Sequence, residues 1–176
     1  GKMRNKDTQL LTLSGFTILE LLVVFSLIAV ISGVGFLSFV SYSREQILLQ
    51  AKGDLKQAVV LARFNALSNV KPAACGSDTL SSYTLKFCTY DNCLGIPGTT
   101  NGQSYVVRAS CGTQNPLVLS NKLPQNVTFL DGVSTPCQNI VFNSVNPVVS
   151  GGPCDVKISG YSDSITFSID LQGYAF

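Results

Sequence analysis

One acidic side chain lies inside a long apolar stretch near the start of the chain. Between Phe16 and Val40 the only ionisable residue is Glu20. A carboxylate in a membrane-spanning helix costs about 2.5 to 3.5 kcal/mol near the membrane centre, so it normally has a partner or a function. A cut after Gly15 would create a positively charged amine at Phe16, one helical turn before Glu20. We predict that Glu20 pairs with this amine in a neighbouring parallel helix and thereby sets the axial register of the two chains.

Cysteines form the second group of residues with chemical potential. All six follow residue 74. An even number of cysteines confined to one region predicts disulfides formed in an oxidising compartment. The short spacing of Cys88 and Cys93 favours one local bridge, worth about 2 kcal/mol. The sequence does not choose among the remaining connectivities of the six residues, which are Cys75, Cys88, Cys93, Cys111, Cys137 and Cys154.

Catalytic chemistry has little support in the sequence. Zinc binding is the rival interpretation of the cysteines, but C-x2-C spacing is missing and the chain has no histidine. Thiol redox catalysis is not supported either, because the chain has no C-x-x-C pair. The absence of histidine also removes the commonest general base, and no nucleophile elbow or phosphate loop occurs. We therefore expect no enzyme activity, no catalytic residue, no metal and no cofactor.

The stretch around Glu20 is long enough to cross a membrane. Residues 16–40 contain no proline, and as a helix they would cover about 37 Å, more than a ~30 Å hydrocarbon core. Lys2, Arg4 and Lys6 precede this stretch, and with Asp7 they account for the whole net charge of +2. Positive charge before a membrane helix places the N-terminus in the cytoplasm. The cysteine-rich part is then outside the cytoplasm, which agrees with disulfide formation.

Helical patterning continues beyond the apolar stretch and becomes amphipathic. We predict a single helix from near Phe16 to about Ser68, with Asn69 and Pro72 as stop signals. The second half should lie against a globular domain by one apolar face. The residues of that face are Ile47, Ala51, Leu55, Ala58, Ala62 and either Asn65 or Ala66. The opposite face carries the basic residues Arg44, Lys52, Lys56 and Arg63.

After the helix the pattern changes to short apolar runs bounded by Gly, Pro, Asn and Asp. Such runs predict strands of an antiparallel sheet or sandwich, so the fold class is α+β. The expected division is a leader at 1–15, a transmembrane helix at 16–40, its amphipathic continuation at 41–70 and an exported domain at 71–176. The predicted strands are Tyr83 to Phe87, Ser104 to Ala109, Leu117 to Ser120, Val127 to Leu130, Ile140 to Phe142, Val156 to Ser159, Ile165 to Ile169 and Gly173 to Phe176.

The segment Gly15-Phe16-Thr17-Ile18-Leu19-Glu20, followed by Leu-Leu-Val-Val, resembles the prepilin processing site of type IV pilins and type II secretion pseudopilins. The resemblance implies cleavage between Gly15 and Phe16 by a prepilin peptidase, which also N-methylates Phe16, and an assembly role for Glu20. It implies insertion in a bacterial inner membrane as a single-pass protein, followed by assembly with other pilin or pseudopilin subunits. The filament would be a periplasmic pseudopilus or a cell-surface pilus.

A second resemblance is shorter. Leu61-Ala62-Arg63-Phe64-Asn65-Ala66 and the ending Ile165 to Ile169 with Gly173 are similar to minor pseudopilins of the H type and to T-type fimbrial proteins, although a serine and an acidic residue usually follow the arginine there. This similarity favours a minor subunit that helps to initiate or cap the filament over a major shaft subunit.

Two other classes of function stay open. A DNA-uptake or adhesive pilin would need its basic residues on one face, and the candidates are Lys71, Lys86, Arg108, Lys122 and Lys157. Because residues 16–176 are neutral overall, nucleic acid is a possible but not an expected partner. The other alternative is a bitopic membrane protein with a tethered binding domain, in which Glu20 reaches the near membrane interface.

Overall fold

This computed structural model describes residues 17–89, 93, 95–130, 135–146 and 149–176. The chain divides into two compact units, residues 1–41 and 42–176. Gly15 and Phe16, the predicted processing residues, lie outside the described residues.

One helix, α1 (Ile18–Leu67), covers the predicted helical region and begins and ends within two residues of the expected positions. At its start the Thr17 hydroxyl oxygen accepts the backbone N–H of Glu20 at 3.2 Å, which is an N-cap. At its end Asn69 adopts a left-handed φ of 51°. The Val70 N–H then bonds the Asn65 carbonyl and the Asn69 N–H bonds the Ala66 carbonyl, a Schellman arrangement that satisfies the last carbonyls. Asn69 is therefore the stop signal that the sequence predicts.

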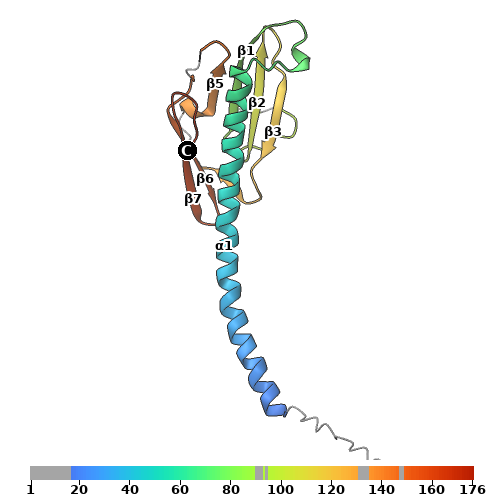
Figure 1. The fold of residues 1–176 in the computed structure, drawn as a ribbon, viewed down its shortest axis with the longest axis vertical. Helices are drawn as coiled ribbons and strands as arrows, with labels where there is room; N and C mark the ends of the chain where they lie inside the picture. Colours follow the sequence, from blue (N-terminus) through green and yellow to red (C-terminus); the bar gives the residue numbers. More distant parts are fainter. Residues whose placement is uncertain (1–16, 90–92, 94, 131–134, 147–148) are drawn as a thin grey trace, which may run out of the picture. The chain divides into compact units, whose positions relative to one another are not determined.

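The rest of the second unit is built from two antiparallel sheets (Figure 1). One has four strands in the order β3-β2-β1-β5, and the other has three in the order β4-β6-β7. The short 3-10 helices η1 (Ala73–Cys75) and η3 (Thr135–Gln138) lie in the connections. The strands are β1 (Leu80–Cys88), β2 (Ser104–Cys111), β3 (Leu117–Lys122), β4 (Val127–Phe129), β5 (Asn139–Asn143), β6 (Cys154–Gly160) and β7 (Asp163–Ile169). The predicted α+β class is confirmed.

The last predicted strand, Gly173 to Phe176, forms only in part. Its first residues belong to a turn in which the Asp170 carboxylate accepts the backbone N–H groups of Gln172 and Tyr174. Its end pairs with β7 through an isolated bridge between Ile169 and Ala175 and two backbone hydrogen bonds between Phe176 and Ser168. Gly173 is required in that turn. Its φ is 76°, and a Cβ would lie 2.6 Å from the Phe142 ring and 2.7 Å from Val149.

The second half of α1 packs on both sheets and forms part of one core. Alanines at 51, 58, 62 and 66 are buried and bring the helix backbone close to the strands, while Leu55 and Val59 fill the space between them. Tyr83 from β1 is 1 % exposed and its hydroxyl donates to the Val70 carbonyl at 2.6 Å. The main strand residues of this core are Leu85, Phe87, Tyr105, Val107, Ile140, Val156, Ile158 and Phe167.

Three disulfides join all six cysteines: Cys75 with Cys111, Cys88 with Cys93, and Cys137 with Cys154. The local Cys88–Cys93 bridge, which spacing alone favours, is among them. The other two depend on topology, since the pairing of Leu80 with Cys111 in β1 and β2 brings the end of β2 close to Cys75.

Removing a bridge should lower the free energy of unfolding, and the loss should be greater for the bridge that closes the longer loop. The sequence separations are 36 for Cys75–Cys111 and 5 for Cys88–Cys93. Loop-closure entropy then predicts losses of about 4 and about 2 kcal/mol for the Cys75→Ala/Cys111→Ala and Cys88→Ala/Cys93→Ala variants. Urea unfolding of the full chain in detergent would measure both, and an equal or reversed order would contradict the connectivity.

Candidate functional site

Glu20 lies in the first turn of α1, three residues after the capping Thr17. A negative charge at this position is favoured by the helix dipole by about 0.3 to 1 kcal/mol. Thr17 and Glu20 have the Thr-x-x-Glu spacing of a capping box, which is a common signal for a helix start. This signal is present in the sequence, but interpreting Glu20 only as an assembly residue misses it. The side chain of Glu20 is exposed. Its charge is therefore open to a partner from outside the chain.

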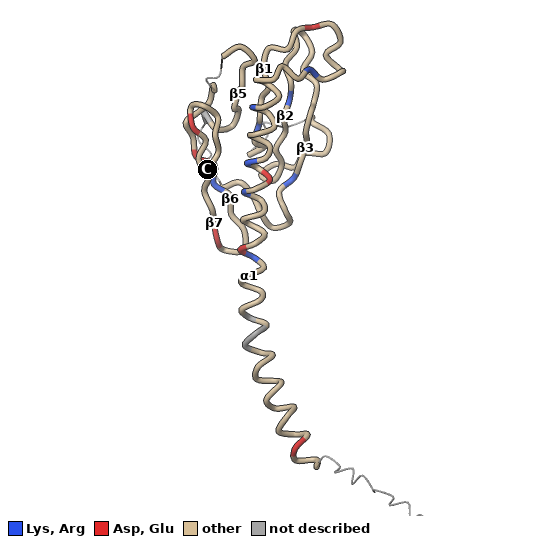
Figure 2. The backbone as a smooth tube through the Cα atoms, viewed as in Figure 1, with Lys and Arg blue, Asp and Glu red and all other residues tan. Residues whose placement is uncertain are grey.

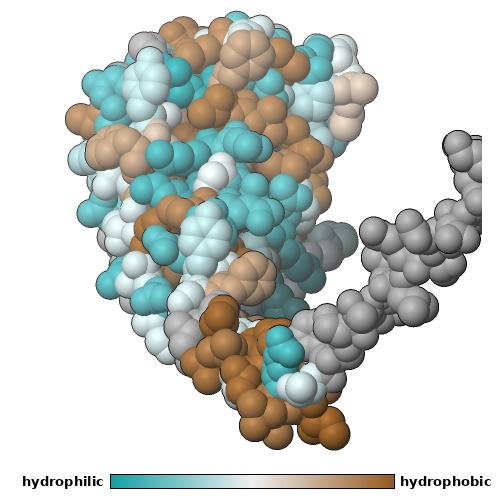
Figure 3. Space-filling model, turned by 60° about the horizontal axis from the view of Figure 1, so that its bottom comes forward, coloured by the Kyte–Doolittle hydropathy of each residue, from teal (hydrophilic) through white to brown (hydrophobic). Residues whose placement is uncertain are grey.

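Apolar side chains surround Glu20 along the first half of α1, and the described ones are exposed from Ile18 to Phe39. Ile18 is 85 % exposed and Ile31 71 % exposed. The sequence of this part of the helix has one charged residue, Glu20. Figure 2 shows red near the start of the helix, and the apolar side chains form the brown surface at the bottom of Figure 3. The helix is long and apolar enough to span a membrane. We call Ile18–Phe39 the apolar half of α1.

Three of the four basic residues predicted on the helix face opposite the apolar one make contacts within the domain. Arg44 lies 5.4 Å from the centre of the Tyr161 ring, and Lys52 donates to the Thr166 carbonyl at 3.4 Å. Arg63 is held most firmly. Its Nε donates to the Gln172 carbonyl at 2.9 Å, and its guanidinium lies 4.0 Å from the centre of the Tyr174 ring. These three side chains tie the helix to β7, to its hairpin and to the C-terminal segment, because their long stems reach over the neighbouring backbone.

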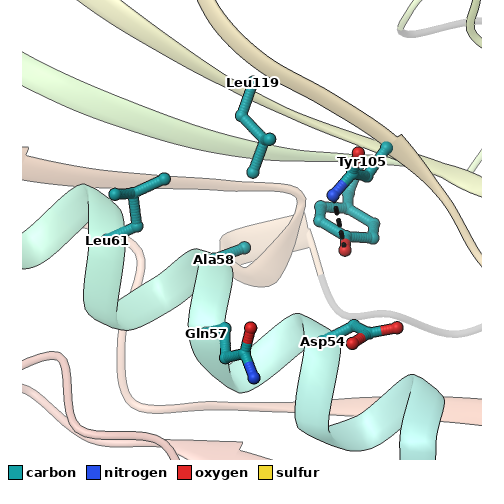
Figure 4. Close-up of a pocket in the computed structure, with 7 residues that line it drawn as sticks. Asp54, Gln57, Ala58, Leu61, Tyr105 and Leu119 are labelled. Carbon is teal, nitrogen blue, oxygen red and sulfur yellow. Dashed lines mark hydrogen bonds between the residues drawn. The ribbon is translucent and has the colours of Figure 1, made fainter.

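A hollow of about 290 Å³ lies between α1 and the strands β2 and β3. Figure 4 shows Leu119 and Leu61 on either side of it, with Asp54 at the rim. The Tyr105 hydroxyl accepts a hydrogen bond of 3.5 Å from the Asn121 amide. Burial raises the pKa of Tyr105, and the charge of Asp54 raises this pKa further. Within the described residues no group of three or more potential metal ligands occurs, and this hollow holds no nucleophile paired with a base.

The raised tyrosine pKa values predict a loss of stability in alkali. Burial also raises the pKa of Tyr83. A phenol with a folded-state pKa above its unfolded value of about 10 stabilises the fold fully below pH 10, and this contribution is lost as pH rises through the folded-state pKa. The free energy of unfolding should therefore fall above about pH 10. Tyr105→Phe should flatten this fall with little change at pH 7, and an unchanged alkaline slope would contradict the assignment.

Three of the five basic candidates for a nucleic-acid face share one side of a sheet, and the other two lie elsewhere. Residues paired directly across antiparallel strands share a face, and Lys86 pairs with Val106 while Lys122 pairs with Ser104. Together with Arg108, these two lie on the face of the four-stranded sheet that is turned away from α1. Lys157 belongs to the other sheet, on β6, and Lys71 donates to the Gly76 carbonyl at 2.8 Å.

No protein-family model, curated protein or solved structure matches this chain.

Proposed function

We propose that this protein is a type IV pilin-like filament subunit that is anchored in a membrane by the apolar half of α1 and later polymerises through it. The observation that carries the proposal is Glu20, a single exposed charge in a continuous exposed apolar helix. Its position one turn after Phe16 supports the proposal, because a cut after Gly15 would create a cation, and none of the residues that the structure describes supplies one to this carboxylate.

The physical argument follows from the surface of the helix. Lipid covers the apolar half before assembly, at about 25 cal/mol for each Å² removed from water. Outside the membrane the same side chains need an equally apolar cover, and other copies of the helix supply it. Pairing Glu20 with the Phe16 amine of a neighbour would compensate the burial of both charges and fix the stagger between copies, since an unpaired buried charge costs several kcal/mol.

We favour a minor subunit over a major shaft subunit. Such a subunit would act in initiation or at the tip of a pilus or pseudopilus. Arg63 supports it, because this residue of the second resemblance joins the end of α1 to the C-terminal turn through Gln172 and Tyr174. Quantitative mass spectrometry of purified filaments would test the choice. A minor subunit should be present at a few copies per filament, whereas a chain that dominates the filament mass would be the shaft subunit.

Whether the chain is recovered in filaments or only in the membrane tests the proposal that it is a filament subunit. Mechanical shearing of cells, or isolation of periplasmic fibres, should recover the chain in filaments with other subunits. Recovery only from the membrane, as a monomer after chemical cross-linking, would contradict the proposal.

A membrane-anchored binding domain is the second candidate, and the Thr17 cap favours it. The hydrogen bond from the Glu20 N–H to the Thr17 hydroxyl caps the helix, so these two residues can be explained without assembly. A carboxylate near the end of a membrane helix can also reach the membrane interface. In that case the chain stays uncut and unassembled, which the same fractionation distinguishes.

A further inference from the structure

The turn between β6 and β7 lies at one end of the three-stranded sheet (Figure 1), and a hollow of about 430 Å³ lies beside it. This volume is within the range of about 300 to 1,000 Å³ that is usual for pockets that hold small ligands. Asn126 and Thr128 line it from the β4 side, and the β6–β7 hairpin supplies most of the rest. Most of the lining side chains carry a hydroxyl, an amide or a carboxylate. The hollow is therefore suited to a polar ligand.

Three hydroxyl side chains line the hollow in a row. Thr128 is paired with Ser159 across β4 and β6, and Ser159 is paired with Ser164 across β6 and β7. Residues paired directly across antiparallel strands share a face, with Cβ atoms about 4.5 to 5.5 Å apart. The neighbouring Phe129 and Ile158 lie in the core, so the row is on the opposite, outer face of the sheet. Within the described residues none of these three hydroxyls has a hydrogen-bond partner, so each is available to a ligand.

The backbone around the hollow is held in an unfavourable conformation. Asn126, Tyr161 and Ser162 have φ values of 65°, 55° and 75°, and they are three of the four described non-glycine residues with a positive φ. All three line the hollow. Tyr161 and Ser162 are the central residues of the two-residue turn between β6 and β7, where asparagine and glycine are strongly preferred. Backbone strain that gathers at one place in this way is typical of functional sites.

The ring of Tyr161 is fixed from two sides. The guanidinium of Arg44 lies 5.4 Å from the ring centre, and the Asn126 side-chain amide donates to the Tyr161 hydroxyl at 3.3 Å. Gly160 lets the hairpin approach the start of β4, since a Cβ there would lie 2.9 Å from the Asn126 carbonyl oxygen. The walls of the hollow are therefore arranged before a ligand arrives, which lowers the entropic cost of binding.

The charge of the lining indicates which polar ligand fits. Asp163 is the one carboxylate among the described lining residues, and none of them is a lysine or an arginine. A phosphate or sulfate would meet a like charge here and no cation. A sugar instead offers several hydroxyls, which donate to a carboxylate and both donate to and accept from serine and threonine. Its apolar C–H groups can pack on the Tyr161 ring.

We infer that this hollow binds a neutral saccharide. The inference goes beyond the proposed function, because it assigns a ligand to the unit of residues 42–176. It does not depend on whether the chain assembles into filaments.

Saturation-transfer NMR of the full chain tests the inference, in a detergent without a sugar headgroup. Chitotetraose represents the glycan of a cell wall, and mannotetraose and lactose represent surface glycans. We expect transfer to at least one of these three probes at millimolar concentration, and the probe that binds distinguishes the two sources. Absence of transfer to all three probes, or displacement of the bound probe by inorganic phosphate, would overturn the inference.

Variants tie the binding to the hollow. Asp163→Ala should weaken binding of the probe at least ten-fold, whereas Asp155→Ala, at a carboxylate of the same sheet outside the hollow, should leave it unchanged. Ser162→Gly should also weaken binding but should not lower the thermal unfolding temperature, because glycine adopts the left-handed conformation without strain. Binding by Asp163→Ala equal to that of the parent chain, or an equal loss with Asp155→Ala, would overturn the inference.

Discussion

Gly15→Leu is expected to leave the chain uncut in the membrane and to abolish its appearance in filaments. The reason is steric, because a peptidase that cuts between residues 15 and 16 must bring the backbone there close to its catalytic groups, and only glycine leaves that approach open. Intact-mass measurement of the membrane fraction should show the full precursor with its basic leader. Ser14→Ala, at the neighbouring position, is the matched control and should be processed normally.

A normally shortened product from Gly15→Leu would contradict the processing claim. Loss of membrane insertion would contradict it too, since the apolar residues 18–39 that enter the membrane are unchanged.

Glu20→Gln should be cleaved and inserted as well as the parent chain but should yield at least ten-fold fewer filaments. The amide keeps the size of the side chain and removes the charge. An ion pair at about 4 Å and an effective dielectric constant of 20 contributes on the order of 4 kcal/mol, enough to favour one stagger over others. Filament yield per processed chain, measured by quantitative immunoblot of sheared material, checks the result.

Two controls separate the charge of Glu20 from its place in the helix cap. Ser26 is a polar residue of the same apolar half, and its hydroxyl donates to the Val23 carbonyl at 2.7 Å. Ser26→Ala should therefore leave assembly unchanged. Thr17→Val removes the cap, at a cost of about 1 kcal/mol, but keeps the carboxylate. Wild-type yield from Glu20→Gln, or an equal loss from Thr17→Val, would contradict the pairing argument.

The helix and most strands could be predicted from the sequence because their limits are local. Asn69 ends α1 by adopting a left-handed conformation, which asparagine tolerates better than most residues. Gly, Pro, Asn and Asp lie near the strand limits, because these residues favour turns or cannot continue a strand. The predicted strand Gly173 to Phe176 forms only in part. Its apolar residues resemble a strand, but the Asp170 side chain holds a turn that the local sequence pattern does not reveal.

The candidate site was predictable in part. The position of Glu20 follows from the sequence, and so does the local Cys88–Cys93 bridge. The other two disulfides depend on which strands pair, which spacing does not determine. The contacts of Arg63 could not be predicted either, because Gln172 and Tyr174 approach it only in the folded chain.

The first residue of the mature chain tests the central claim most directly. Filaments, or their periplasmic equivalents, should be isolated and digested, and the N-terminal peptide should be measured by mass spectrometry. We predict a peptide that begins at Phe16 and carries one additional methyl group on its amine. Chains that retain residues 1–15, or that begin at any other residue, would contradict it, because the cation proposed to pair with Glu20 would then not exist.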